Sequence, residues 1–275
     1  MTTAYSTFLA EKKTVQTKSV QSYVIQGHKV WLKKASKRHS TWIYLPLRWA
    51  SKLLRLEVLS PIPNFGGDVA IACEIQRLIQ LHTQHIRVPK ILAQDHDAFL
   101  ISDAAPPNEQ CAELGLTLKK QKTTAQRLDV YRKAIQALQQ THLQRAYLSE
   151  AFARNILIDQ DQNLTFIDFE TDPAAVLNLE QCQSRDWLCF IFSTAAYFNR
   201  DELAPASLLI TQVLAEHSQS FAEVSRVAGK IQWIAKFKPE KLGKDGLRLI
   251  KSIELLGMIQ HEYQLNHHKS LSESE

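Results

Sequence analysis

Two short apolar stretches, each with one polar residue of a metal-binding type, most restrict how this chain can fold. Asn155 precedes Ile156-Leu157-Ile158, and Asp168 follows Thr165-Phe166-Ile167. The residues between these stretches, Asp159-Gln160-Asp161-Gln162-Asn163, are turn formers. The segment is therefore predicted to be a strand, a tight turn and a second strand, with an amide and a carboxylate side by side at one end. The alternative is an ordinary hairpin in which Asn155 and Asp168 only cap turns.

Amide and carboxylate oxygens suit a magnesium ion that also carries phosphate oxygens. On these residues the chain resembles the protein-kinase-like superfamily, whose catalytic loop ends in a metal-binding Asn and is followed by an Asp-Phe-Gly carboxylate. The resemblance implies that Asn155 and Asp168 bind Mg²⁺. At the position of the family's catalytic Asp this chain has Glu150, and Leu148 replaces the usual His. The resemblance thus assigns to Glu150 the positioning of the acceptor hydroxyl.

An earlier part of the chain extends the resemblance. Two strands are predicted at Tyr23–Ile25 and Lys29–Lys33, and a helix is predicted at Asp68–His82 with Asp68 as its N-cap. Val30-Trp31-Leu32-Lys33 occupies the place of the family's Val-Ala-Ile-Lys strand. This implies that Lys33 contacts phosphate and that Glu74, in the helix, pairs with Lys33. Without the resemblance, Lys33 is a surface lysine of a basic strand.

The segment from residue 46 to residue 59 is predicted to be an amphipathic helix. Pro46 fits a helix start, and Arg48, Lys52 and Arg55 form a basic stripe beside a face that contains Trp49 and leucines. Such a helix can lie on an anionic membrane or pack on the small lobe with its charges in water. The surplus of basic residues before residue 60 suggests an anionic partner, and a solvated basic face is the alternative.

The second half of the chain is predicted to be mainly helical. Ala104-Ala105-Pro106-Pro107-Asn108 is a linker, which the resemblance makes the hinge against which a nucleotide base lies. Apolar residues at helical spacing predict a helix at Thr124–Leu143, in which His142 is interpreted as a core histidine. Ser184–Phe192 is predicted to be a buried helix. Asp186 either caps that helix or, as in the family, holds the backbone N–H groups of the catalytic loop.

Composition limits the class of protein. The 275 residues include 45 % hydrophobic and 22 % charged residues, with a formal net charge of +5, which is typical of a globular protein. Only eight glycines are present, which argues against a β-sandwich and a glycine-rich phosphate loop. The four cysteines are scattered, and no apolar stretch reaches the length of a spanning helix, so a cytoplasmic protein is predicted, with peripheral binding to the inner face of the membrane through residues 46–59 as an option.

These observations predict an α+β chain with the two-lobed fold of the resembled superfamily, in which a small β-rich N-lobe precedes a larger, mainly helical C-lobe. The predicted divisions are a flexible arm at 1–19, the N-lobe at 20–103 with the helical insertion 46–59, the hinge at 104–110, the C-lobe at 111–266 and a disordered tail at 267–275. The forms Arg-Asn-Ile and Ile-Asp-Phe-Glu are similar to those of the bacterial lipopolysaccharide-kinase and aminoglycoside-phosphotransferase branch.

Two functions follow from the resemblance. The first is an ATP-dependent phosphotransferase that acts with Mg²⁺ on a hydroxyl of a sugar, a lipid-linked saccharide or another small molecule. The second is a nucleotide-binding pseudokinase that serves as a regulatory or membrane-surface interaction module. Glu150 and Leu148 decide between them, because they depart from the family at the step that positions the acceptor. Nucleic-acid binding is disfavoured, since the chain has no motif for it and its aromatic residues are not interleaved with basic ones.

Overall fold

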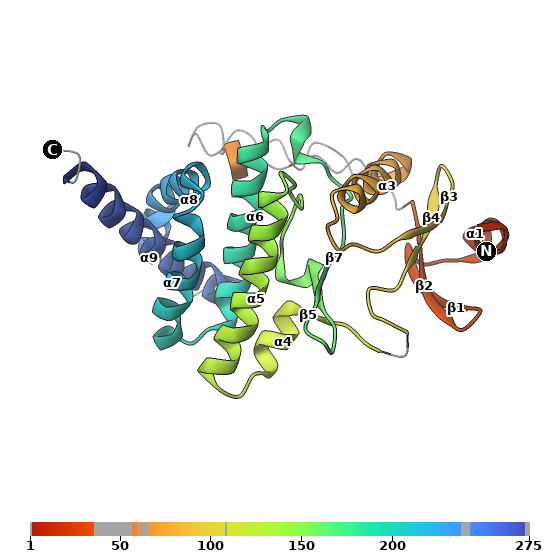
Figure 1. Ribbon diagram of the computed structural model, residues 1–275, viewed down its shortest axis with the longest axis horizontal. Helices are drawn as coiled ribbons and strands as arrows, with labels where there is room; N and C mark the ends of the chain where they lie inside the picture. Colours follow the sequence, from red (N-terminus) through yellow and green to blue (C-terminus); the bar gives the residue numbers. More distant parts are fainter. Residues whose placement is uncertain are drawn as a thin grey trace. The chain divides into compact units, whose positions relative to one another are not determined.

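The computed structural model describes residues 2–35, 57–59, 62, 66–107, 109–237 and 243–272. The fold is α+β, and the chain divides into two compact units (Figure 1). Unit 1 contains the described residues up to Ala112, except Glu57 and Val58, together with Asn155–Val176. Unit 2 contains Glu57, Val58, Glu113–Arg154 and the chain from Leu177 onward. The hairpin with Asn155 and Asp168, which was predicted to belong to the C-lobe, therefore lies in unit 1 with Lys33 and Glu74.

A four-stranded antiparallel sheet forms the centre of unit 1. Its strands are β1 (Val20–Ile25), β2 (His28–Lys34), β3 (Ile91–Gln94) and β4 (Ala98–Ser102), in the order β1-β2-β4-β3. Gln26 and Gly27 join β1 to β2 with positive φ angles of 50° and 81°, as a two-residue hairpin turn requires. The two strands predicted at Tyr23–Ile25 and Lys29–Lys33 are thus confirmed, each with a few more residues than the pattern indicated.

Residues 2–15 form helix α1 (Thr2–Val15), so the prediction of a flexible arm at 1–19 was wrong for this part. Phe8 and Leu9 lie one helical turn after Tyr5, and all three pack with Val30 and Leu32 of β2. The ammonium group of Lys13 also bonds to two carboxylates at the turn between β3 and β4. Helix α1 is largely polar in composition, and its contacts with β2 and with the turn between β3 and β4 hold it in place.

Helix α3 (Gly67–Thr83) packs against β3 and β4, as α1 does (Figure 1). Because side chains alternate along a strand, Val30 and Leu32 of β2 face α1, whereas Lys33 points to the other side and reaches Glu74 of α3. The helix predicted at Asp68–His82 is confirmed, but its N-cap is Gly66 and no side chain caps it. Asp68 lies in the first turn instead, where its negative charge stabilises the helix by interacting with the positive end of the helix dipole.

The predicted hairpin is present as β6 (Ile156–Ile158) and β7 (Leu164–Phe166), which pair antiparallel. A second sheet has the order β5-β6-β7, with β5 at Ala112–Glu113. A short 3-10 helix, Ala153–Asn155, precedes β6, and another, Pro173–Ala175, follows the hairpin. The hairpin thus begins directly after Asn155 and ends before Asp168.

Apart from Glu113 of β5, the regular elements among the described residues of unit 2 are all helices. Its longer helices are α4 (Leu114–Lys120), α5 (Thr124–Leu143), α6 (Leu179–Thr194), α7 (Leu203–Leu214), α8 (Ser218–Ile231) and α9 (Lys244–Ser272), and short 3-10 helices cover Ala195–Tyr197, Arg200–Glu202 and Gln232–Phe237. The predicted helix at Thr124–Leu143 is confirmed at both ends. Trp187, Tyr131, Phe190 and Phe198 are fully buried, and Tyr131 stacks on Phe190 with 5.2 Å between ring centroids.

Two predictions concern segments that the structure describes only in part. Of the helix predicted at 46–59, only Glu57–Leu59 is described, as a 3-10 helix, and the remainder lies outside the described residues. Helix α9 continues to Ser272, so residues up to that point are helical where a disordered tail was predicted from 267. Within the described part of the chain, no helix is both long and apolar enough to cross a membrane.

Candidate functional site

The predicted ion pair between Lys33 and Glu74 is present in unit 1. The Lys33 ammonium lies 2.7 Å from Oε1 and 2.6 Å from Oε2 of Glu74. Only 12 % of the Lys33 side chain and 2 % of the Glu74 side chain are exposed. Strand β2 directs Lys33 to this side of the sheet, and the middle of α3 supplies Glu74. The lysine is therefore not a surface residue of a basic strand.

Two further carboxylates approach the same ammonium group. Asp168 Oδ1 and Glu170 Oε1 each lie 3.7 Å from Lys33 Nζ. Both side chains are more exposed than Glu74, at 42 % for Asp168 and 38 % for Glu170. We call these four residues, Lys33, Glu74, Asp168 and Glu170, the Lys33 cluster. Within these four residues, three formal negative charges face one positive charge, and two of the three carboxylates are partly exposed.

The charges in the Lys33 cluster keep the lysine protonated. Burial acts to lower the pKa of Lys33, but the negative charges of Glu74 and Asp168 and the hydrogen bond to Glu74 outweigh it, so the pKa of Lys33 is raised. Burial raises the pKa of Glu74 more than the charge and hydrogen bond of Lys33 lower it. A protonated lysine that is held in one place is able to bind an anion, such as a phosphate oxygen, beside the exposed carboxylates.

The hairpin and α3 together position Asp168. The backbone N–H of Ile167 donates to the Asn155 carbonyl at 3.0 Å, and that of Phe166 donates to the Arg87 carbonyl at 3.0 Å. The next residue, Phe169, is buried, and its carbonyl accepts from the thiol of Cys73 in α3 at 3.6 Å. Asp168 itself has a φ of 73°, a conformation that few residues other than glycine adopt. A strained backbone at a residue with an exposed carboxylate is a frequent property of binding and catalytic sites.

Asn155 supplies the backbone carbonyl that accepts the hydrogen bond from Ile167, the residue before Asp168. Only 5 % of Asn155 is exposed, and it joins the 3-10 helix to β6. The hairpin turn is capped by a different residue, Asp159, whose carboxylate accepts from the backbone N–H of Asn163 at 2.8 Å and from Arg87 at 2.8 Å. The turn between β6 and β7 is thus capped by Asp159, and not by Asn155 or Asp168. The structure brings Lys33, Glu74, Asn155 and Asp168 into one unit and links Asn155 to the residue that precedes Asp168.

Glu150, the remaining predicted site residue, belongs to unit 2. Its Oε1 lies 3.5 Å from a guanidinium nitrogen of Arg185, and the Glu150 side chain is 31 % exposed. Arg185 is itself buried, and it also donates to the carbonyl of Val58 at 2.9 Å. The carboxylate that was predicted to position the acceptor hydroxyl thus has a cationic partner, Arg185. The sequence gives no indication of this pairing.

Asp186 connects helix α6 to the loop before Glu150. It is fully buried in the second turn of α6, whose N-cap is Asn178 with a capping box to Gln181, so the N-cap interpretation of Asp186 was wrong. Its Oδ2 accepts from the backbone N–H of Leu148 at 2.6 Å and lies 3.2 Å from Nε2 of His142. This is the backbone-holding role that the resemblance implies. His142 is buried as predicted, with Trp187 packed edge-on against its ring.

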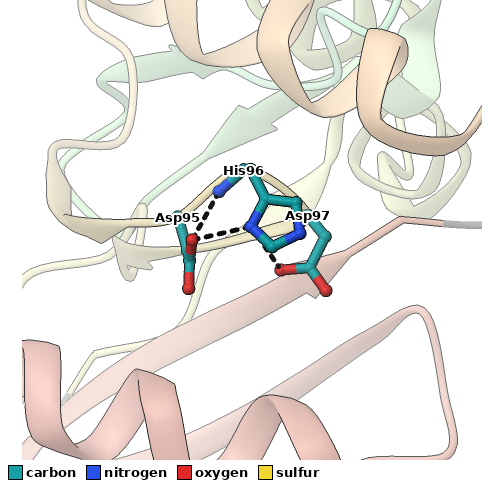
Figure 2. Close-up of side chains that lie close together, drawn as sticks. All are labelled: Asp95, His96 and Asp97. Carbon is teal, nitrogen blue, oxygen red and sulfur yellow. Dashed lines mark hydrogen bonds and ion pairs between the residues drawn. The ribbon is translucent and has the colours of Figure 1, made fainter.

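A second group of potential metal ligands lies at the turn between β3 and β4. Ligand-type atoms of Asp95, His96 and Asp97 lie within 4.8 Å of one another (Figure 2). The ammonium of Lys13 bonds to Asp95 at 2.6 Å and to Asp97 at 2.9 Å, and the ring of His96 bonds to Asp95 at 2.9 Å. Lys13 lowers the pKa of Asp95 well below its usual range. A cation of the chain thus already compensates this cluster, and its contacts fasten α1 to the sheet.

Glu170 and Arg185 also lie at the candidate sites, although the sequence did not identify them. Glu170 follows Asp168 in the motif Ile167-Asp168-Phe169-Glu170, so its position was visible, but only the fold shows that it faces Lys33. No sequence signal connects Arg185 with Glu150. A scan against protein-family models and a search of curated proteins both gave no match to this chain.

Proposed function

We propose that this protein is an ATP-dependent phosphotransferase with a two-lobed, protein-kinase-like fold, in which unit 1 is the nucleotide-binding lobe and unit 2 the helical lobe. The acceptor is a hydroxyl of a sugar, a lipid-linked saccharide or another small molecule. The observation that carries the proposal is the Lys33 cluster: a buried lysine held by a helix glutamate, with the exposed carboxylate of Asp168 3.7 Å from its ammonium group. Charge neutralisation around transferred phosphate is the main requirement of this reaction.

The residues of unit 1 have distinct tasks in this proposal. Lys33 binds a phosphate oxygen of ATP, and Glu74 fixes the lysine through both carboxylate oxygens. The hairpin holds Asp168 through the contact between Ile167 and Asn155, so the carboxylate is preorganised at the phosphate end of the nucleotide. Preorganised charges cost no rearrangement at the moment of reaction, which is why their placement contributes strongly to the rate.

The donor set of the Lys33 cluster fits a magnesium ion. Carboxylate and amide oxygens are hard ligands, and the carboxylates of Asp168 and Glu170 are both partly exposed beside Lys33. Asp168 and Asn155 are the residues that would hold the ion, as the sequence motif implies. When bound, Mg²⁺ neutralises negative charge on the phosphates. Without a cation, the carboxylates of Asp168 and Glu170 would repel the phosphate that Lys33 attracts.

In the proposed reaction Glu150 accepts the proton of the acceptor hydroxyl as its oxygen bonds to the terminal phosphorus of ATP, while the bond from that phosphorus to the β,γ-bridging oxygen breaks and ADP leaves. Leu148 and Glu150 flank Ser149, whose φ of 74° is again unusual for a residue other than glycine. The hydrogen bond from Leu148 to Asp186 fixes the backbone of this loop. Arg185 limits how far the Glu150 carboxylate is able to move, because the buried guanidinium is anchored to the Val58 carbonyl.

The pairing of Glu150 with Arg185 also favours a second candidate, a nucleotide-binding pseudokinase. A carboxylate that is bound to a cation is a weaker proton acceptor than a free one. In that case unit 1 binds nucleotide, and the protein acts as a regulatory or membrane-surface module without phosphoryl transfer. The two candidates share the Lys33 cluster and differ only in what Glu150 does.

Calorimetric titration of the full chain with ATP and Mg²⁺ tests the proposal, combined with transfer of the terminal phosphate to a panel of sugars and saccharide lipids. We expect binding that requires Mg²⁺ and that Lys33→Ala removes. Lys90→Ala is the matched control, since Lys90 is an exposed lysine of the same unit. Binding without transfer to any acceptor supports the pseudokinase candidate. Absence of ATP binding by the folded wild-type protein would rule out both.

A further inference from the structure

The four-stranded sheet of unit 1 has two edge strands, β1 and β3, and β3 is protected against pairing with another chain. Strand β3 is four residues long, and its pairing with β4 shifts register between Ile91 and Ala93. Pro89 comes shortly before it, and both α1 and α3 pack against it. Short length, an irregular register and a nearby proline are devices by which natural sheets prevent an edge from binding a further strand.

Strand β1, at the other edge of the sheet (Figure 1), has none of these devices. Its six residues, Val-Gln-Ser-Tyr-Val-Ile, include no charged residue, proline or glycine, and they pair with β2 in one unbroken register. In the described part of the chain, β2 is its one neighbour in the sheet. Val20 is 41 % exposed and Val24 is 71 % exposed. A regular, uncharged and exposed edge of this kind readily pairs with another strand.

The pairing with β2 shows which backbone groups β1 directs outward. The backbone N–H of Lys34 donates to the carbonyl of Ser19 at 2.8 Å, so Ser19 and every second residue after it hydrogen-bond towards β2. The residues between them, Val20, Ser22 and Val24, therefore direct their N–H and C=O groups away from the sheet. All three residues are exposed.

We propose that the β1 edge pairs antiparallel with the β1 edge of a second copy of this chain, about a two-fold axis at Ser22. In an antiparallel pair, outward-facing residues hydrogen-bond with outward-facing residues of the other strand. When Ser22 lies opposite its own copy, Val20 of each copy lies opposite Val24 of the other. All the outward-facing residues of β1 are then paired, and the contact is the self-complementary one of an isologous dimer.

The distribution of charge favours a second copy as the occupant of this edge. In the proposed register Lys18, just before β1, lies opposite Gln26 of the second copy, so the two Lys18 residues are kept apart. Like charges directly opposite each other would destabilise the pair. A strand of another protein would need pockets for its side chains in order to be selected, whereas self-pairing requires only β1 itself. The inference does not depend on the proposed function.

Sedimentation equilibrium of the full chain, at concentrations up to about 1 mM, tests the inference. We expect wild type to dimerise with a dissociation constant of roughly 1–100 µM, because the paired edge is a small interface. Ser22→Lys places two lysines opposite each other at the two-fold axis and should weaken the dimer by roughly 10- to 100-fold. Ser22→Glu should do the same. An equimolar mixture of the two variants should dimerise again, because lysine then lies opposite glutamate.

Val69→Lys is the matched control, because Val69 is a 53 % exposed residue of α3 in the same unit, and this variant should dimerise like wild type. Thermal melting shows whether each variant is folded. Hydrogen exchange of wild type needs no variant: the N–H groups of Val20, Ser22 and Val24 should exchange more slowly at high protein concentration than at low concentration.

A wild-type protein that stays monomeric up to about 1 mM would overturn the inference. Undiminished dimerisation of Ser22→Lys and of Ser22→Glu would also overturn it, because the interface would then lie elsewhere. If the mixture of the two variants failed to dimerise, the two-fold register at Ser22 would be wrong. None of these outcomes bears on ATP binding, which the calorimetric titration measures separately.

Discussion

The carboxylates of the two candidate regions differ in how their charge is balanced. In unit 1, Glu74 is buried against Lys33, while Asp168 and Glu170 remain partly exposed and share the same single lysine. In unit 2, Glu150 pairs with Arg185, and Asp186 is buried with a backbone N–H and an imidazole as partners. Within the Lys33 cluster three carboxylates thus face one lysine, and two of the carboxylates are accessible to a ligand, whereas Glu150 and Asp186 of unit 2 lie against an arginine and a buried backbone N–H.

This difference indicates which half of the proposed reaction is better supported. Accessible carboxylates beside a fixed lysine are what binding of a metal–phosphate complex requires. A carboxylate that is held by arginine is less suited to accept a proton. These charges therefore support nucleotide binding by unit 1 more strongly than proton transfer by Glu150. Substitutions in each region test the two roles separately.

The largest effect is expected from Asp168→Asn. The substitution removes the charge of the exposed carboxylate that adjoins Lys33, so Mg²⁺-dependent binding of ATP should become undetectable by calorimetry. Asp161→Asn, an exposed aspartate in the turn of the same hairpin, should bind like wild type. If Asp168→Asn retained Mg²⁺-dependent affinity, the negative charge of Asp168 would have no role in binding.

Glu150→Gln should have the next largest effect, and on turnover only. If Glu150 accepts the proton of the acceptor hydroxyl, the substitution should lower kcat by roughly two to four orders of magnitude while ATP affinity is unchanged. The measurement is steady-state transfer to whichever acceptor the wild-type protein uses. An unchanged kcat would mean that Glu150 is a structural partner of Arg185 and would end its assignment as a catalytic residue.

Asp186→Ala should destabilise the fold by about 2–4 kcal/mol, because the backbone N–H of Leu148 and the ring of His142 would lose a buried acceptor. Urea unfolding measures the change in the free energy of unfolding. Asp161→Ala should lower it by less than about 0.5 kcal/mol, as expected for an exposed residue. A small effect of Asp186→Ala would show that the loop before Glu150 is held by other contacts.

The smallest effect concerns Glu202, which accepts from Thr124 and the backbone N–H of Asn199 and pairs with Arg127. Burial acts to raise the pKa of Glu202, but these partners outweigh it and lower the pKa below 4.5. A lowered pKa in the folded state contributes stability above the unfolded pKa, and this contribution is lost as the pH falls through the folded value. Glu202→Gln should therefore reduce stability at pH 7 by about 1–2 kcal/mol and by less near pH 3.

Chemical denaturation of wild type and Glu202→Gln between pH 7 and pH 3 checks this prediction. The difference between the two proteins should shrink as the pH falls below about 4.5, the usual glutamate pKa. A constant difference across that range would mean that Glu202 contributes through packing and neutral hydrogen bonds. Glu202 would then no longer differ from Glu74 in the direction of its pKa shift, since burial raises the pKa of Glu74.

Local patterns in the sequence predicted the regular elements of the fold well. The apolar spacing at Thr124–Leu143 gave both ends of α5, and alternation with turn formers located β1, β2 and the β6–β7 hairpin. The pairing of Lys33 with Glu74 was predicted from the resemblance, which assigns it to a strand lysine and a helix glutamate; the local patterns located only the strand and the helix. Such elements depend on contacts within a few residues, so the local sequence contains most of the information that determines them.

The remaining features depend on contacts between distant parts of the chain. Helix α1 was not predicted, since its apolar residues are few and gain their stabilisation from β2 and β3. Glu170 beside Lys33 and Arg185 beside Glu150 likewise have no local signature, and the contact of Asp186 with Leu148 was expected only from the resemblance. The sequence by itself determined most of the strands and helices that the structure describes, and its resemblance to a known family gave the candidates for phosphate and metal binding. Only the tertiary structure decided which charges meet, because the partners of a buried charge are chosen by packing between elements and not by their spacing along the chain.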